Sequence, residues 1–135
     1  MSDIVDFRLS LEPQIAALAA VRRTDADMIV LEDICKTSPL ELDQEGSYSL
    51  DHQFHLALST ATQNHLILTL SQSMYEWIAI ARKQIHSTRD GRDTSFSGHL
   101  KIFEAVAAGD AARARTEMRT HIECASEVEI PSRTE

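Results

Sequence analysis

Residues that interrupt helices are scarce in this chain of 135 residues. Only four glycines and three prolines are present, and aromatic residues make up 5% of the sequence. Alanine, leucine, glutamate, arginine and glutamine fill the long segments between these few breaks. All five favour helices. The composition therefore predicts an all-α fold, and the length suits one domain with a real core.

Long apolar runs are also missing from the sequence. No segment approaches the roughly 18 apolar residues that a membrane-spanning helix needs. The first residues lack the basic and apolar regions of a signal peptide. We therefore expect no membrane partner and a cytoplasmic location.

Positively charged residues and cysteines are also few. Thirteen Lys and Arg residues stand against 21 Asp and Glu residues, which gives a net charge of −8. An acidic domain repels phosphate backbones, so we expect no direct contact between this chain and nucleic acid. The two cysteines, Cys35 and Cys124, lack a metal-type spacing, and we expect reduced, packed thiols.

Apolar residues recur at helical spacing in six segments. Capping residues mark several of the segment starts, among them Thr24, Asn64 and Asp110. The first segment contains Pro13, so either its helix begins there or one longer helix bends there. The expected helices cover residues 4–22, 25–37, 48–62, 65–86, 98–108 and 111–129, with loops at 38–48 and 87–97. Short links between them predict an antiparallel bundle.

Two pairs of polar residues lie within these apolar segments. Asp51 and His55 are four residues apart and therefore project from one face of a helix. His99 lies ten residues before Gly109 and His121 twelve residues after it, which is about 15 and 18 Å at ~1.5 Å per residue. In an antiparallel hairpin these two imidazoles come level. Spacing alone does not establish whether the two pairs face each other.

One carboxylate and three imidazoles together make a mixed oxygen and nitrogen ligand set. Such a set suits Zn, Ni, Co, Mn or Fe rather than Ca or Mg. Four protein ligands either close a tetrahedral zinc site or leave positions of a five- or six-coordinate ion open. Taken singly, each histidine fits a surface or hydrogen-bonded core position better than a metal site, so the hypothesis depends on all four residues. The other histidines, His52, His65 and His86, are assigned to the surface.

Several stretches of the sequence resemble one known family. They are Arg8–Pro13 followed by Ala16–Ala20, Asp51-x-x-Phe54-His55 with Asn64, His99–Asp110, and Ala114 with Met118 and His121. Together they resemble the FadR-type C-terminal (FCD) effector domain of GntR-superfamily transcription regulators. The resemblance covers about residues 5–128 of a single domain that we expect to span residues 1–135.

This resemblance implies an antiparallel bundle of about six helices with a central metal and ligand pocket. The metal would be a divalent transition metal, zinc first, with Ni, Mn, Co or Fe as alternatives. The implied metal ligands are Asp51, His55, His99 and His121. A small organic acid would bind at or beside the metal. The guanidinium of Arg8 could then bind a second carboxylate or a hydroxyl group of this acid. The alternative for Arg8 is a surface salt bridge with Glu12. Arg82 and Trp77 are weaker pocket candidates, and we expect Trp77 in the core.

The resemblance also implies a regulator rather than an enzyme. Its ligand would shift the orientation of two protomers in a homodimer. Full-length members of the family carry an N-terminal winged-helix DNA-binding domain, and no segment here resembles one. We therefore expect an isolated or truncated effector domain that senses a small carboxylate and dimerises, and that reaches DNA only through such a winged-helix domain.

Two alternatives stay open at this point. A metal-dependent enzyme would use open coordination positions and a metal-bound water as nucleophile. The Glu-x-x-His motif of di-iron bundles does not occur in the sequence. The second alternative is a metal-stapled module, by which we mean a dimerisation domain whose metal only stabilises the bundle. Such a module would bind metal tightly, lose stability on chelation and show no response to small molecules.

Overall fold

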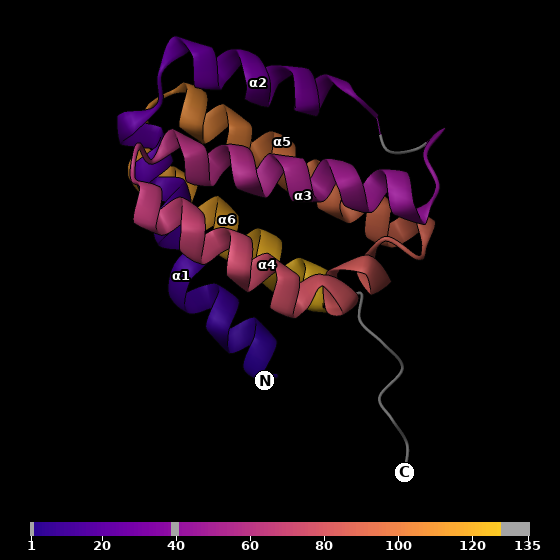
Figure 1. Ribbon diagram of the computed structural model, residues 1–135. Helices are drawn as coiled ribbons and strands as arrows, with labels where there is room; N and C mark the ends of the chain where they lie inside the picture. Colours follow the sequence, from indigo (N-terminus) through magenta and orange to yellow (C-terminus); the bar gives the residue numbers. More distant parts are fainter. Residues whose placement is uncertain (1, 39–40, 128–135) are drawn as a thin grey trace.

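The computed structural model describes residues 2–38 and 41–127. These described residues form six α-helices and no strand, which confirms the all-α prediction (Figure 1). The helices are α1 (Asp3–Arg22), α2 (Asp25–Lys36), α3 (Gln44–Ala61), α4 (His65–Ile85), α5 (Arg89–Ala107) and α6 (Ala111–Glu127). Residues 128–129 of the last expected helix and the tail from residue 131 lie outside the described residues.

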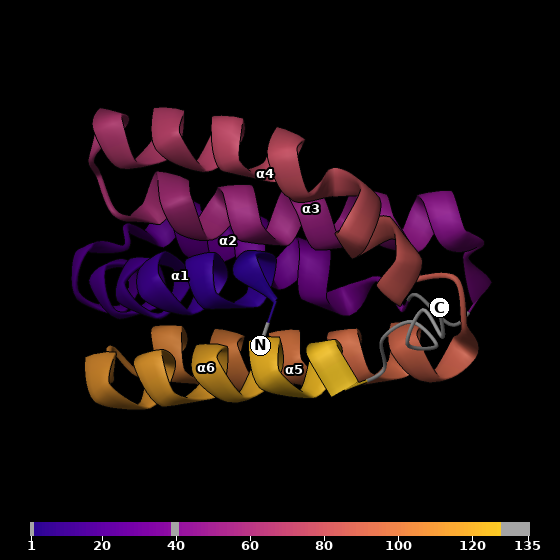
Figure 2. The same ribbon diagram turned by 90° about the horizontal axis from the view of Figure 1, so that it is seen from below.

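Helix α1 runs through the middle of the bundle. Figure 2 shows it between two helical pairs, with α3 and α4 on one side and α5 and α6 on the other. Its most extensive packing is against α6, and α2 packs across α3 and α5 (Figure 1). The core lies between these helices, and its largest fully buried apolar side chains include Phe54, Leu58, Ile102, Met118 and Ile122.

The helix starts follow local signals in the sequence. Thr24 and Asp27 form the expected reciprocal capping box at α2, with hydrogen bonds of 2.9 and 3.1 Å. The side chain of Asn64 accepts a hydrogen bond from the amide two residues on at 2.9 Å. The side chain of Asp110 accepts one from the amide three residues on at 3.0 Å. Of the two alternatives for Pro13, the structure has the longer helix, because α1 continues through this residue.

Helix α5 begins at Arg89, nine residues before the predicted start, so the predicted loop at 87–97 is largely wrong. The side chain of Thr88 caps the helix by accepting a hydrogen bond from the amide of Gly91 at 3.0 Å. A Cβ atom on Gly91 would lie 1.7 Å from the carbonyl oxygen of Ile85. Glycine at position 91 therefore allows two backbone segments to approach closely, and it does not mark a loop.

Helix α3 also begins earlier than predicted, at Gln44. Its cap is Asp43, whose side chain accepts a hydrogen bond from the amide of Gly46 at 2.8 Å. Ser47 and Ser49, which stand near the predicted start of this helix and could have capped it, lie inside the helix, and Ser47 is buried. The extra turn brings Ser47 into the interior, where it contacts His86.

The helical spacing of the segment at residues 65–86 predicts an inner face of Leu66, Leu70, Met74, Trp77, Ile78 and Ala81, and the structure confirms it only in part, because Met74 and Ile78 are buried. Leu66 and Trp77, both expected inside, are 81% and 67% exposed. The buried residues of this helix are Ser71, Met74, Tyr75, Ile78, Arg82 and Ile85. Apolar residues occupy two separate stripes of α4, and only one of them faces the rest of the bundle.

Within the described part of the chain, none of the helices combines the length and apolar character needed to cross a membrane.

Candidate metal centre

The structure brings the four candidate ligands into one buried cluster. Asp51 and His55 lie one turn apart on α3, His99 lies on α5 and His121 on α6. One oxygen or nitrogen atom from each side chain lies within 4.8 Å of all the others. All four side chains are buried. The question that spacing left open is thus answered, because the two pairs face each other.

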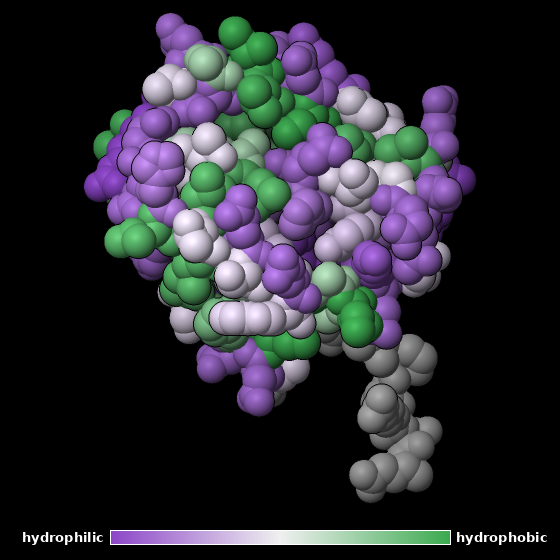
Figure 3. Space-filling view, in the orientation of Figure 1, coloured by the Kyte–Doolittle hydropathy of each residue, from purple (hydrophilic) through white to green (hydrophobic). Residues whose placement is uncertain are grey.

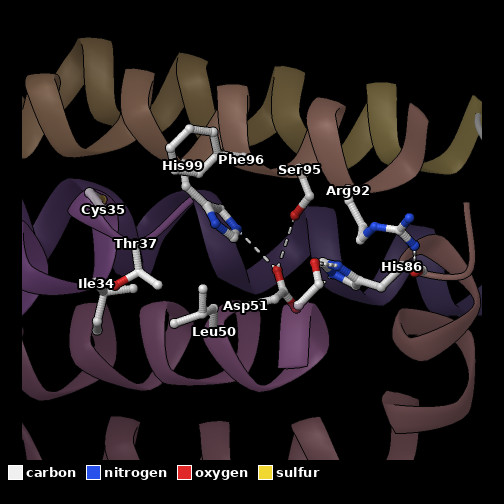
Figure 4. A pocket seen from close by; sticks show the side chains of 11 residues that line it. Ile34, Cys35, Thr37, Leu50, Asp51, His86, Arg92, Ser95, Phe96 and His99 are labelled. Carbon is white, nitrogen blue, oxygen red and sulfur yellow. Dashed lines mark hydrogen bonds and ion pairs between the residues drawn. The ribbon is translucent and has the colours of Figure 1, made fainter. Parts of the chain in front are cut away.

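Several nitrogen atoms in this cluster lack a hydrogen-bond partner. His99 Nε2 lies 3.0 Å from Asp51 Oδ1, and His55 Nε2 lies 3.3 Å from the same oxygen. These contacts are too poorly aligned for hydrogen bonds, and His121 Nδ1 also has no partner among the described residues. Figure 4 shows the His99 ring directed towards Asp51. Buried nitrogens without partners are costly unless another species satisfies them.

The dimensions of the cluster fit a transition-metal ion. Ligand atoms bound at about 2.1 Å lie at most about 4.2 Å from one another. The observed spread of up to 4.8 Å needs only a small inward shift of side chains. A metal ion would also satisfy the nitrogen atoms that lack partners. The residues present therefore fit a divalent ion, although metal ligation itself stays a prediction.

The pKa values of three of the four residues are shifted in the direction that favours metal binding. Burial opposes ionisation of Asp51, but Arg82 and His55 outweigh it and hold the pKa of Asp51 well below its usual range. Burial lowers the pKa of His99 to about 4, although Asp51 partly offsets this effect. Burial also lowers the pKa of His121, as do the neighbouring His99 and His55. Asp51 thus offers a carboxylate, and His99 and His121 offer neutral imidazoles, which are the forms that bind metals.

A second, buried layer supports His55 from α1. Its Nδ1 lies 3.2 Å from Glu12 Oε1, and Arg8 Nε donates to Glu12 Oε2 at 2.5 Å. Burial disfavours the Glu12 carboxylate, but Arg8 and His55 together lower its pKa below the usual range. A carboxylate behind a ligating histidine fixes ring orientation and raises the basicity of the ligand. The predicted Arg8–Glu12 salt bridge exists, but it is buried rather than on the surface.

Glycine at position 98 makes room for the fourth ligand. A Cβ atom on Gly98 would lie 2.3 Å from Nδ1 of His121 and 3.0 Å from its Cγ. Any larger residue would therefore displace the His121 ring from its present position. The sequence alone gave no sign of this role, because Gly98 and His121 lie on different helices.

Further polar residues surround Asp51 on its other side. Arg82, which the sequence offered only as a weak pocket candidate, forms a short ion pair with Asp51 Oδ2. His86 is 2% exposed, so its assignment to the surface was wrong. Its Nδ1 lies 2.7 Å from Ser47 Oγ, and its Nε2 lies 3.8 Å from Asp51 Oδ2. Ser95 donates a hydrogen bond to Asp51 Oδ1 at 3.4 Å (Figure 4).

Two small cavities flank Asp51, each of about 10 Å³, which is room for about one water molecule. One opens towards α2 and is lined in part by His86, Arg92, Ser95 and His99 (Figure 4). The other is lined in part by Arg8, Arg82, His86 and His121. Trp77, the other weak candidate, is exposed on α4 and lines neither cavity.

The remaining predictions concern residues away from the cluster. His65 is exposed as expected, and His52 is partly buried beside the rings of Tyr48 and Tyr75. Both cysteines are free thiols. Cys35 is packed as predicted, and burial raises its pKa to about 11. Cys124 is exposed rather than packed.

An all-helical bundle around a buried cluster of one aspartate and three histidines defines a class of binding domain. Comparison with known proteins places the chain within that class. The family model described as "FCD domain" matches residues 3–123, so the chain belongs to the FCD domain family.

Relatives with curated names are transcription regulators. The chain is 34% identical to the HTH-type transcriptional regulator LutR of Bacillus subtilis, over 90% of this chain and 58% of that protein. It is 31% identical to the Uxu operon regulator of Haemophilus influenzae, over 90% of this chain and 48% of that protein. The solved structure of Streptococcus agalactiae GntR matches with a TM-score of 0.73 and 25% identity, over 93% of this chain and 57% of that one.

These findings confirm the predicted family and agree with the prediction of a regulator rather than an enzyme. The chain spans about half the length of the curated relatives that it matches.

Proposed function

We propose that this chain is the effector-sensing, metal-binding domain of a GntR-type transcription regulator. The observation that carries the proposal is the buried cluster of Asp51, His55, His99 and His121, whose imidazole nitrogens include several without a hydrogen-bond partner among the described residues. Such a domain would work inside the cytoplasm. DNA would be contacted by a winged-helix module, because the net charge of −8 on this chain disfavours direct contact.

Zinc is the first choice for the metal, with Ni, Mn, Co or Fe as alternatives. Three imidazoles and one carboxylate match the ligand preferences of these ions. When bound, such an ion supplies positive charge and open coordination positions for an oxygen ligand. The protein residues hold the ion and exclude most of the water around it, because all four ligands are buried.

The effector is proposed to be a small organic acid that binds beside the metal. Arg8 and Arg82 line the same small cavity as Asp51 and His121. Their guanidinium groups place positive charge next to the metal ligands, and guanidinium groups recognise carboxylates well. Arg8 therefore stays in the proposed effector site as a residue that lines it.

A thermal-shift screen of organic acids tests this function. Zinc-loaded protein is expected to melt at a higher temperature with at least one hydroxy-acid or dicarboxylate, because a ligand that binds only the folded state stabilises it. The same acid should have no effect after chelation. Metal-dependent turnover of the acid would favour the enzyme alternative instead. Stabilisation by metal without a response to any acid would favour the metal-stapled module.

We also propose that the chain forms a homodimer through the exposed stripe of α4. This stripe consists of the exposed residues Leu66, Leu70, Trp77 and Ile80, with the half-buried Ser73 between them. Its residues are spaced alternately by four and three, as in the contact seam of two packed helices. Large apolar side chains are found at similar distances on either side of Ser73. An antiparallel copy of α4 would therefore place apolar residues opposite apolar residues, which suits a twofold interface. Figure 3 shows apolar side chains mixed with polar ones on the face that carries α4.

Replacement of Ile80 by glutamate is expected to dissociate the dimer. Ile80 is 77% exposed in the single chain, so the new carboxylate does not disturb the fold. In the dimer it would be buried opposite an apolar stripe without a partner, which costs several kcal/mol. Sedimentation velocity should show a shift from dimer to monomer over micromolar concentrations. Gln72→Glu, an exposed position on another face of α4, is the matched control and should stay dimeric. A dimeric Ile80→Glu variant would contradict the interface.

A further inference from the structure

A groove lies on the surface between α5 and α6, the two helices that pack side by side in Figure 2. Its volume is about 290 Å³, which is room for several water molecules. Several of its wall residues are exposed, among them Ser97 on α5 and Thr120 on α6. The groove is therefore open to solvent along the hairpin that carries two of the candidate metal ligands.

His121 belongs both to the wall of this groove and to the ligand cluster. It is 4% exposed, and its buried Nδ1 has no partner among the described residues. This Nδ1 lies against Gly98, another wall residue, where a Cβ atom would approach it to 2.3 Å. The centroid of the His121 ring is 4.8 Å from that of His99 and 5.6 Å from that of His55. A single imidazole thus stands between the groove and the other ligands.

The two cavities beside Asp51 are much smaller than this groove. Each has a volume of about 10 Å³, which is room for about one water molecule. All four candidate ligands are buried, so an ion must cross part of the protein to reach them. An ion that arrives with water ligands fits the groove and does not fit these cavities.

The wall of the groove carries groups that attract and bind a transition-metal ion. Cys124 is an exposed free thiol three residues after His121, so both side chains project from one face of α6. Thiolates are strong ligands of zinc and related ions. Asp93 and Glu117 contribute two carboxylates to the wall, and Lys101 contributes one positive charge. The resulting negative charge draws cations to the groove.

We propose that divalent transition-metal ions enter and leave the centre through this groove, with the Cys124 thiolate as the first strong ligand that they meet. The inference rests on the metal centre proposed above. Cys124 would lose its proton to solvent as it binds the ion, pass the ion to His121 one turn away, and then take up a proton again. Because Cys124 lies outside the cluster of four ligands, it sets how fast the centre fills and not how tightly it holds the ion.

Stopped-flow rates of zinc uptake by metal-free protein and of zinc release to excess chelator test this route. Thr120→Trp places a large side chain in the groove and replaces no ligand. It should slow uptake and release tenfold or more and change the Kd by less than about twofold, because an obstacle on the route raises only the barrier. Thr116→Trp, at an exposed position of α6 outside the groove, is the control and should exchange zinc at wild-type rates.

Alkylation of the folded wild-type protein with N-ethylmaleimide obstructs the groove without any substitution. Cys124 is exposed, whereas Cys35 is only 8% exposed and should react slowly. The alkylated protein should show the same slowing of both rates as Thr120→Trp. In Cys124→Ser the reagent should have no effect. This comparison keeps the test valid if a tryptophan variant fails to fold.

Untreated Cys124→Ser should exchange zinc severalfold more slowly than the wild type, because a hydroxyl group is a weaker ligand than a thiolate. Unchanged rates in this variant would overturn the role of the thiol. Unchanged rates in Thr120→Trp and in the alkylated protein would overturn the whole route and leave the proposed function intact. Wild-type protein that takes up no zinc would overturn the metal centre on which the inference rests.

Discussion

Removal of zinc is expected to lower the melting temperature of this domain by about 10–20 °C. A ligand present at a thousand times its Kd stabilises the folded state by about 4 kcal/mol. For a domain of this size, each kcal/mol shifts the melting temperature by roughly 3–5 °C. The gain arises because the ion neutralises a buried carboxylate and satisfies nitrogen atoms that lack partners. Calorimetric scans of zinc-loaded protein, with and without chelator, measure the difference.

The variant His99→Ala tests whether this stabilisation comes from an ion bound at the proposed centre. It removes one ligand but leaves the Arg82–Asp51 ion pair intact, unlike a change at Asp51 itself. The variant should melt at nearly the same temperature with and without chelator. His65→Ala, at an exposed position on α4, should keep the full sensitivity of the wild type. Equal chelator sensitivity in His99→Ala and His65→Ala would show that the stabilising ion binds elsewhere.

Glu12→Ala is expected to destabilise the protein by about 3–5 kcal/mol, because it leaves a buried cation without its partner. Arg8 is 5% exposed and donates two hydrogen bonds to Glu12. The same change removes the carboxylate that faces His55 Nδ1. Loss of such a group typically weakens metal binding by about 10–100-fold. Denaturant unfolding and a competitive zinc titration measure the two effects separately.

The double variant Arg8→Met with Glu12→Leu separates the two roles of Glu12. It replaces the ion pair by apolar side chains of similar size, so much of the lost stability should return. Zinc affinity should stay low, because His55 still lacks its carboxylate. Glu45→Ala removes an exposed carboxylate with a 3.9 Å contact to Lys83 and should change stability by less than about 0.5 kcal/mol. If Glu12→Ala were equally mild, the buried Arg8–Glu12–His55 arrangement would have no supporting role.

The sequence predicted the four residues of the centre for two separate reasons. The spacing of Asp51 and His55 places both on one face of any helix, and the short turn after α5 brings His99 and His121 level. Both relations are local, because each depends on the geometry of one helix or one hairpin. The contact between the two pairs depends on how α3 packs against the hairpin, which no local spacing determines. Only the family resemblance linked the two pairs.

Packing also explains what the sequence did not reveal. Glu12 lies four residues after Arg8, the usual spacing of a surface ion pair, and only the central position of α1 buries it. His86 follows the last residue of α4 and looked like a surface residue, but the early start of α3 brings Ser47 beside it. The two apolar stripes of α4 have the same helical period. Periodicity could not tell that the stripe with Leu66 and Trp77 remains exposed in the single chain.

The metal content of the protein tests the central claim most directly. Protein purified without a histidine tag would be loaded with zinc, dialysed to remove loosely bound ions and weighed by native mass spectrometry. We predict one zinc ion per chain in the wild type and less than about a tenth of that in His99→Ala. Wild-type protein that holds no zinc and no other divalent ion under these conditions would contradict the account. So would a His99→Ala variant that retains one ion per chain.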